Sequence, residues 1–265
     1  MTSPTNPPNM SPQPQRTPPP VDAGPCVWDF PDARHAEDDG LVAVGADLTP
    51  ATLVHAYRNG VFPWPHGTRK LPWFSPNPRG VLPLDEVYLS KTLRQTLRRS
   101  GWTATVDHAF DEVTKACATR PGEGTWITPS MRDAYRQLHQ LGWAHSVEIW
   151  DDTRLVGGCY GLLVGSMYVG ESMFHRATDA SKVALVELAS RLREGGAGLI
   201  DVQLVTDHLA SMGARAIHRN LYLDLLRELR DEPASMLRDR LPVGRHVAAE
   251  ALETSDSSQP STAAN

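Results

Sequence analysis

Periodic apolar positions divide the central part of the chain into short strands and helices. Alternating or continuous runs of branched apolar residues, typical of strands, occur at 102–106, 145–150, 155–164, 167–172 and 199–205. Apolar positions with helical spacing occur at 51–59, 91–100, 109–118, 128–142, 180–196 and 221–229. Helices and hairpins around a mixed sheet predict an α+β or α/β fold.

Two of these helices have the same start signal. Thr49 precedes Pro50, and Thr128 precedes Pro129. A threonine hydroxyl can cap the first free backbone N–H groups, and proline fits the first helical position. Gly142 then marks the end of the second helix, because glycine readily adopts the left-handed conformation that follows a helix.

Proline-rich segments suggest the domain boundaries. The segment 60–79 is too rich in proline for a regular element, so a boundary is predicted near residue 77. Residues 1–25 and 243–265 lack apolar periodicity and are expected to be disordered tails. The remaining chain is predicted to form a small N-terminal domain at 26–77 and a larger domain at 78–242.

The composition of the chain limits the cellular compartments in which the protein is expected. The sequence shows no apolar signal-peptide core, and its longest uncharged run, 155–170, is too short and glycine-rich to span a bilayer. Its three cysteines form no CxxC pair. These features predict a cytoplasmic protein without membrane contact. The net charge of −5 argues against a surface that is basic throughout, but not against a local basic patch.

Two strands carry acids where apolar residues would be expected. In the strand 199–205, Asp201 and Gln203 share one face, and the opposite face is apolar. Glu171 lies among methionines and aromatic residues in the preceding strand. A partly exposed strand face or a structural partner explains each acid about as well as a pocket does. A buried acid is nevertheless costly, so a pocket floor is the functional alternative.

Basic residues cluster on two helices, and other chemistries lack their motifs. The first cluster is Lys91, Arg94, Arg98 and Arg99, and the second is Arg176, Lys182, Arg191 and Arg193. The simpler interpretation of each cluster is a helix face exposed to solvent, and the functional alternative is a surface that contacts phosphates. No histidine pair has the spacing of a zinc site, and no serine has the GxSxG surround, so neither a metal site nor a serine hydrolase is predicted.

Six collinear motifs resemble the bacterial leucyl/phenylalanyl-tRNA–protein transferases. They are DGLVAVGADLTPATLVHAYRNGVFPW, WFSPNPRGVL, GTWIT, LVGGCYG, GESMFHRATDASKVAL and LIDVQLVTDHLASMGARAIHR. Together they extend from about Asp39 to Arg219, so only the tails fall outside the resemblance.

The resemblance implies both an activity and a fold. The activity is transfer of leucine or phenylalanine, and less well methionine, from aminoacyl-tRNA to proteins with an N-terminal arginine or lysine, which marks them for N-end rule degradation. The fold is a small α+β domain followed by a mixed-sheet domain like that of N-acetyltransferases. The aminoacyl ester is already activated, so no cofactor is expected.

The resemblance also assigns site residues. Asp201 and Gln203 match the polar pair at the reaction centre, beside Glu171. The residues expected near the terminal adenosine of the tRNA are Trp64, Trp126, Tyr57 and Tyr135. Those expected in the aminoacyl side-chain pocket are Cys159, Tyr168, Gly170, Met173, Leu185, Leu188, Leu192 and Ile200.

One departure and two rival functions remain. Cys159 stands where the family pattern suggests methionine, which affects the expected preference between leucine and phenylalanine. An acyl-CoA-dependent N-acetyltransferase is one rival, but its glycine-rich turn before the helix at 180–196 is missing. A non-catalytic adaptor that binds tRNA or protein N-termini is the other.

Overall fold

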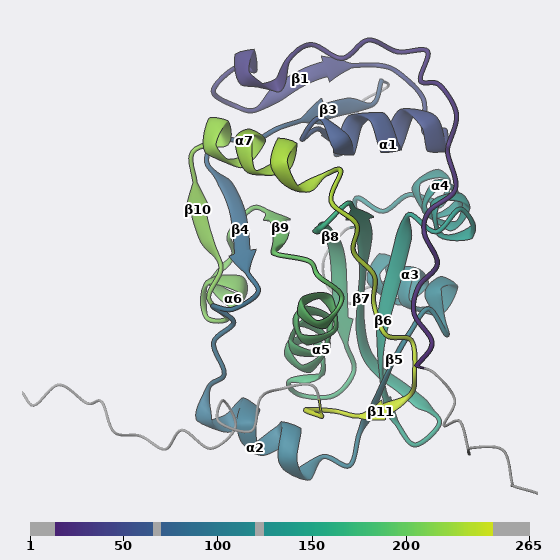
Figure 1. The fold of residues 1–265 in the computed structure, drawn as a ribbon, viewed down its shortest axis with the longest axis vertical. Helices are drawn as coiled ribbons and strands as arrows, with labels where there is room; N and C mark the ends of the chain where they lie inside the picture. The colour runs from purple at the N-terminus through teal and green to yellow at the C-terminus, as the bar shows by residue number, and fades with distance from the viewer. Residues whose placement is uncertain (1–13, 66–69, 120–124, 246–265) are drawn as a thin grey trace, which may run out of the picture.

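The computed structural model describes residues 14–65, 70–119 and 125–245, which contain two β-sheets (Figure 1). The smaller sheet is antiparallel, with strand order β1-β3-β2. The elements of this part are η1 (Ala33–His35), β1 (Leu41–Val44), α1 (Pro50–Arg58), β2 (Phe62–Pro63) and β3 (Pro72–Phe74).

The larger sheet has eight strands in the order β10-β4-β9-β8-β7-β6-β5-β11. Its strands are β4 (Arg79–Pro83), β5 (Thr103–Val106), β6 (Ala144–Asp151), β7 (Arg154–Val164), β8 (Met167–His175), β9 (Leu199–Gln203), β10 (Arg215–Ile217) and β11 (Leu241–Pro242). β8 and β9 run parallel, whereas their neighbours pair antiparallel. The mixed sheet confirms the predicted α+β class.

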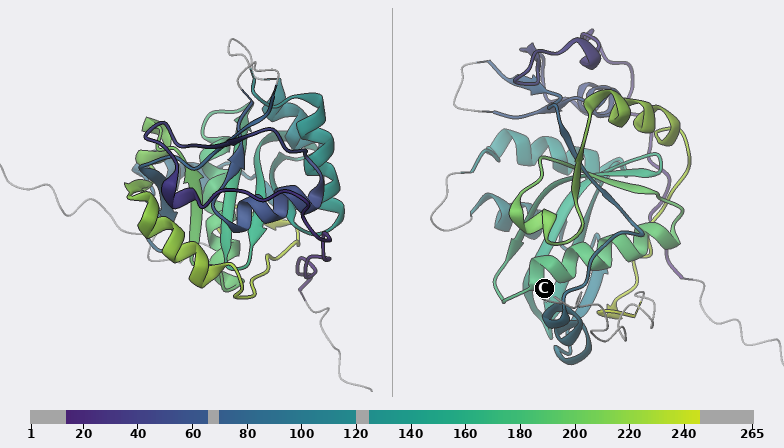
Figure 2. Two further views of the ribbon diagram at one scale, coloured as in Figure 1. Left: turned by 90° about the horizontal axis from the view of Figure 1, so that it is seen from above. Right: turned by 90° about the vertical axis from the view of Figure 1, so that its left-hand side faces the viewer.

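Helices cover both faces of the larger sheet (Figure 2). The helices are α2 (Lys91–Arg99), α3 (Phe110–Ala118), α4 (Pro129–Gln140), α5 (Ala180–Glu194), α6 (Asp207–Ala210) and α7 (Arg219–Leu229). Residues of α3 and α4 share one hydrophobic cluster with α1 and β3, and residues of α2 and α5 belong to a second cluster. The small sheet therefore packs into the same core as the larger domain rather than around a core of its own.

Both predicted Thr-Pro helix starts are confirmed. The Thr49 hydroxyl accepts a hydrogen bond from the Thr52 backbone N–H, and the Thr128 hydroxyl accepts one from Met131 N–H. Gly142 follows the second helix with φ +77°, the left-handed conformation that ends many helices.

Residues 14–25 are more regular than the sequence suggests. We call them the N-terminal strap, because they run along two distant parts of the chain. Thr17 N–H donates to the Met236 carbonyl at 2.8 Å, and Val21 N–H donates to the Leu141 carbonyl at 2.8 Å. The expected disordered tail therefore does not extend to residue 25 in the structure. Residues 1–13 and 246–265, also expected to be disordered, lie outside the described residues.

Among the described residues, no helix combines the length and apolar character needed to cross a bilayer.

Candidate functional site

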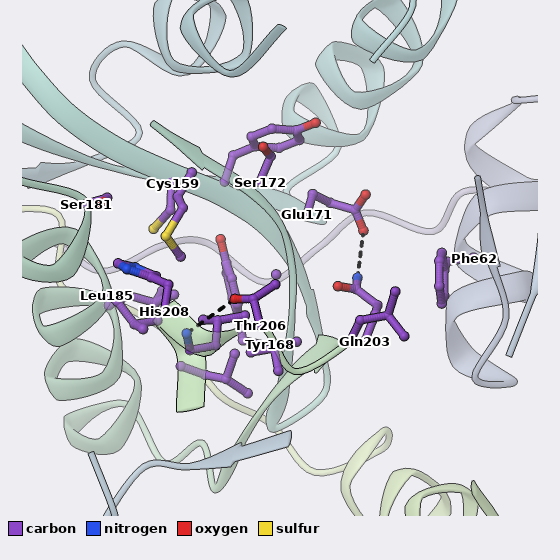
Figure 3. A pocket seen from close by; sticks show the side chains of 18 of the residues that line it. Phe62, Cys159, Tyr168, Glu171, Ser172, Ser181, Leu185, Gln203, Thr206 and His208 are labelled. Atoms are coloured by element: carbon purple, nitrogen blue, oxygen red, sulfur yellow. Dashed lines mark hydrogen bonds between the residues drawn. The ribbon is translucent and has the colours of Figure 1, made fainter. Parts of the chain in front are cut away.

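A cavity of about 850 Å³ opens where β8 and β9 separate (Figure 3). The last parallel pair of these strands is Val169 with Asp201. Beyond it β8 continues to His175, while β9 ends at Gln203. Glu171 and Gln203, just past the last pair, therefore face the opening between the strands, on the side toward Phe62.

The cavity has an aromatic end and an aliphatic end. Phe62 of β2 lies at the end nearest the small sheet, with the Trp64 ring centre 6.4 Å from its own, and Trp126 also lines the cavity. The other end is lined mainly by apolar side chains from β7, β8, α5 and β9: Cys159, Tyr168, Met173, Leu185, Leu188, Ile200 and Val202. Its size falls within the range usual for ligand sites, and the polar groups of Glu171 and Gln203 lie between the two ends.

Glu171 lies at the centre of a hydrogen-bonded group that joins three elements. Tyr57 on α1 donates to Oε1 at 2.7 Å, and the Tyr135 hydroxyl on α4 is hydrogen-bonded to Oε2 at 2.6 Å. The Gln203 amide donates to Oε1 at 3.4 Å. Burial raises the pKa of Glu171 to about 7, although the tyrosine hydrogen bonds oppose this rise. Glu171 is therefore a pocket group that can change its charge near neutral pH.

Asp201 is fully buried in an ion pair with Arg79 of β4. The Arg79 guanidinium donates to both carboxylate oxygens, at 2.8 Å and 2.6 Å. Tyr222 of α7 donates to Oδ2 at 2.8 Å, and Gln203 N–H donates to Oδ1 at 2.9 Å. Four donors thus saturate a carboxylate that does not line the cavity. Of the polar pair expected at the reaction centre, Gln203 lines the cavity and Asp201 does not.

Gln203 depends on Asp201 for its unusual backbone. Its φ is +57°, in the left-handed region that costs a residue with a Cβ about 1 kcal/mol or more. The hydrogen bond from its N–H to Asp201 Oδ1 holds this conformation. The strand ends there, and the side chain turns into the cavity beside Glu171 (Figure 3). Asp201 consequently positions the amide that faces the pocket.

The cavity gathers most of the predicted site residues. The residues that line it are Glu171, Gln203, Trp64, Trp126, Cys159, Tyr168, Gly170, Met173, Leu185, Leu188 and Ile200. Tyr57 and Tyr135, predicted beside the adenosine, instead lie buried behind Glu171. Leu192 is buried in the α5 cluster and does not line the cavity.

The basic residues divide into exposed and buried ones. Those exposed to solvent are Lys91, Arg98, Arg99, Arg176 and Arg193, and Arg94 and Lys182 are half-buried. The prediction that Arg191 contacts phosphates is wrong. Its guanidinium is fully buried and donates to the carbonyls of Leu237 and Ala104. Burial lowers the pKa of Arg191, and the nearby Glu187 carboxylate opposes that shift.

Sequence reasoning missed Arg79 and Tyr222. Arg79 is the last residue of a proline-rich segment, so its sequence context suggests a charge exposed at the surface. In the structure its guanidinium instead packs over the Tyr222 ring, 4.3 Å from the ring centre. The one available signal was Asp201 itself, because a buried acid in a strand requires a partner.

Asp107, His139 and His145 form a group whose spacing could hold a metal ion. Both imidazole rings already use Nδ1 in hydrogen bonds: His145 with Asp107 Oδ2, and His139 with the Ala144 carbonyl, each at 2.8 Å. These bonds give the group a structural role between α4 and β6. None of the three residues lines the cavity.

Comparisons with known proteins agree with this architecture. Residues 81–227 match the model of the leucyl/phenylalanyl-tRNA protein transferase family, and residues 46–77 match that of its N-terminal domain. Curated relatives carry the name leucyl/phenylalanyl-tRNA–protein transferase. That of Chromohalobacter salexigens is 52% identical over 210 residues, 78% of this chain and 82% of its own. That of Stutzerimonas stutzeri is 50% identical over 201 residues, 75% of this chain and 89% of its own. The chain belongs to the leucyl/phenylalanyl-tRNA–protein transferase family, whose members are aminoacyltransferases.

Proposed function

We propose that the cavity accepts leucine or phenylalanine esterified to tRNA and transfers it to the α-amine of proteins that begin with arginine or lysine. The observation that supports this most is the order of groups along the cavity. The aromatic end matches a nucleotide base, the central amide and carboxyl match the reacting ester, and the aliphatic end matches an apolar side chain. The transfer would take place in the cytoplasm and mark the acceptor for N-end rule degradation.

The aliphatic end suits a long apolar side chain. Leu185, Leu188 and Ile200 are almost completely buried, and His208 lies beside Leu185 in the cavity (Figure 3). In such a pocket one methylene changes binding by only about 1–3 kcal/mol, so depth and shape select the amino acid. Cys159 lines this end and is shorter than the methionine of the family pattern, which favours a wider side chain.

The aromatic end suits the terminal adenosine. Trp64 and Trp126 are half-buried and line the cavity, so each offers part of its ring to a base. Stacking of this kind tolerates any base and contributes about 1–3 kcal/mol. The Trp64 ring packs edge-on against Phe74 with ring centres 5.7 Å apart, a contact that favours this orientation of the indole.

The reaction requires little more than orientation. The acceptor nitrogen forms a bond to the ester carbonyl carbon, the bond from that carbon to the ribose oxygen breaks, and the ribose oxygen takes up a proton as the amine loses one. The Gln203 amide is the group that can accept a hydrogen bond from the amine. Asp201 acts through Gln203 by holding its backbone in place. Holding two reactants in this way lowers the barrier without a metal or a covalent intermediate.

The exposed basic residues of α2 and of the α5 ends are proposed contacts to tRNA phosphates. Lys91, Arg98 and Arg99 lie together around a small surface hollow, with Gln95 between them. Contacts to phosphates weaken as salt concentration rises, because bound counterions are released.

The test is transfer of labelled leucine from charged tRNA to a peptide that begins with arginine. Matched peptides beginning with alanine, or with an acetylated arginine, serve as controls. Label on the arginine peptide alone supports the proposal. Equal labelling of the alanine peptide would contradict the proposed acceptor specificity. Acetylation of the arginine peptide from acetyl-CoA would favour the N-acetyltransferase alternative.

A further inference from the structure

Glu171 in the cavity wall and two tyrosines behind it lie within hydrogen-bond distance of one another. The hydroxyl oxygens of Tyr57 and Tyr135 are 2.5 Å apart. Tyr57 is also 2.7 Å from Glu171 Oε1, and Tyr135 is 2.6 Å from Glu171 Oε2. Two oxygens at such distances repel unless a hydrogen lies between them. The closed ring therefore requires three hydrogens.

The two phenols supply only two of them. Burial raises the pKa of both phenols well above the usual value, so each keeps its single hydrogen. The Gln203 amide donates to the outer side of Oε1 and does not lie between the phenols. An ionised Glu171 would therefore leave one side of the ring without a hydrogen, whereas a protonated Glu171 fills all three.

We propose that Glu171 works as a neutral carboxylic acid, and that its closed ring with Tyr57 and Tyr135 positions the Gln203 amide for the acceptor amine. Because Gln203 donates to Oε1, the acid hydrogen lies on Oε2 and points to Tyr135. Tyr135 then donates to Tyr57, and Tyr57 donates to Oε1. The carbonyl oxygen of Gln203 is left to face the substrate. This inference rests on the proposed function, since it assigns the resting state of the same site.

The charged surroundings of Glu171 agree with a neutral acid. Asp201 lies on the neighbouring strand, and its negative charge favours the protonated form of Glu171. Arg79 has the opposite effect, but its guanidinium is bound to Asp201. Tyr160 packs edge-on against Tyr135 with ring centres 5.5 Å apart and is a further titratable neighbour. Burial raises the pKa of Glu171 to about 7, so the ring loses its third hydrogen as pH rises above that value.

Glu171→Gln separates this inference from the alternative that Glu171 is an ionised base. A glutamine amide can donate to Tyr135 and accept from Tyr57, so it closes the same ring without a titratable proton. Alanine cannot close it. A base, in contrast, would be lost equally in both variants, at a cost of about 10²–10⁴ in rate.

The first readout is single-turnover transfer of leucine to the arginine peptide from about pH 6 to about pH 9, values that bracket the pKa of a free α-amine. The ratio of the Glu171→Gln rate to the wild-type rate should rise with pH across this range, because only the wild type loses the third hydrogen, and a constant or falling ratio would contradict the inference. Glu171→Ala and Tyr57→Phe should be slower at every pH. Dividing the transfer rate of a variant by the wild-type rate on the same peptide at the same pH removes the effect of the amine's own titration. A loss of about 10²-fold in Glu171→Gln at the acid end would overturn the inference.

The second readout does not depend on activity. The infrared difference between wild type and Glu171→Gln isolates the carboxyl stretch of Glu171 from that of other buried acids such as Glu148. A protonated carboxyl band that fades as pH rises through about 7 is expected. Its absence at the acid end would overturn the inference even in an active enzyme. A wild type that shows the band but transfers no leucine would instead contradict the proposed function.

Discussion

Replacement of Arg79 by methionine should destabilise the fold far more than a typical charge removal. Methionine keeps much of the length of the side chain but none of its donors. The change removes both hydrogen bonds to Asp201, the bond to the Tyr222 hydroxyl and the bond to the Gly60 carbonyl. Asp201 would then be a buried carboxylate with only Tyr222 and Gln203 as donors.

The magnitude follows from the loss of one partner of a buried ion pair. Such a loss costs about 3–5 kcal/mol, because the remaining charge has no compensation. The double variant Arg79→Met/Asp201→Asn removes both charges, so it should cost clearly less than the sum of the two single changes. A coupling free energy of about 2 kcal/mol or more is expected between them.

Urea unfolding of the four proteins at neutral pH measures this coupling, provided that the denaturant dependence stays the same. Arg193→Met, at the exposed end of α5, is the matched control and should change the free energy of unfolding by about 0.5 kcal/mol or less. Additive single effects, or a loss below about 1 kcal/mol in Arg79→Met, would refute the view that the pair is a buried structural unit.

Three further outcomes can be measured. Trp126→Ala should weaken use of aminoacyl-tRNA by about 1–3 kcal/mol, seen as a raised KM for charged tRNA; an unchanged KM would exclude base stacking there. Arg98→Glu with Arg99→Glu should lower tRNA affinity and its dependence on salt, and an unchanged salt slope would place the tRNA backbone elsewhere. Burial raises the pKa of Glu148 to about 7. The stabilisation from its protonated form is therefore complete below about pH 4.5 and is lost as pH rises to about 7. Glu148→Gln should thus gain about 2–3 kcal/mol relative to wild type between pH 5 and pH 8, measured by chemical unfolding, and a constant difference would contradict this.

Local patterns predicted the elements of this fold well. The strands and the Thr-Pro helix starts depend on side-chain alternation and capping, which operate over a few residues. The apolar cavity wall could be anticipated for the same reason, since Ile200 and Leu185 follow strand and helix periods. The roles of Asp201 and Glu171 could not be read this way, because their partners come from distant elements.

Three differences show where local reasoning stops. Arg79 pairs with Asp201 across 122 positions, so nothing near it in the sequence indicates burial. Arg191 lies on α5, a helix that is buried on almost all sides. The charged helix face that was predicted to include Arg191 is therefore not exposed at that position. The N-terminal strap is rich in proline, but proline keeps its carbonyl, and the other residues of the strap supply the N–H groups that bind Met236 and Leu141.

The strap has a consequence for the newborn chain. Arg16 bonds with Ser235, 219 positions later, and Arg238 N–H donates to the Gln15 carbonyl. At about 5–20 residues per second, a ribosome needs roughly 10–40 s to make the partners of a segment that emerged first. Val21 can bind Leu141 as soon as both residues have left the ribosome, whereas Gln15 and Thr17 have no partner until residues 236–238 are made. The strap therefore closes in two separate steps, and the later step joins segments that lie about 219 positions apart in the chain.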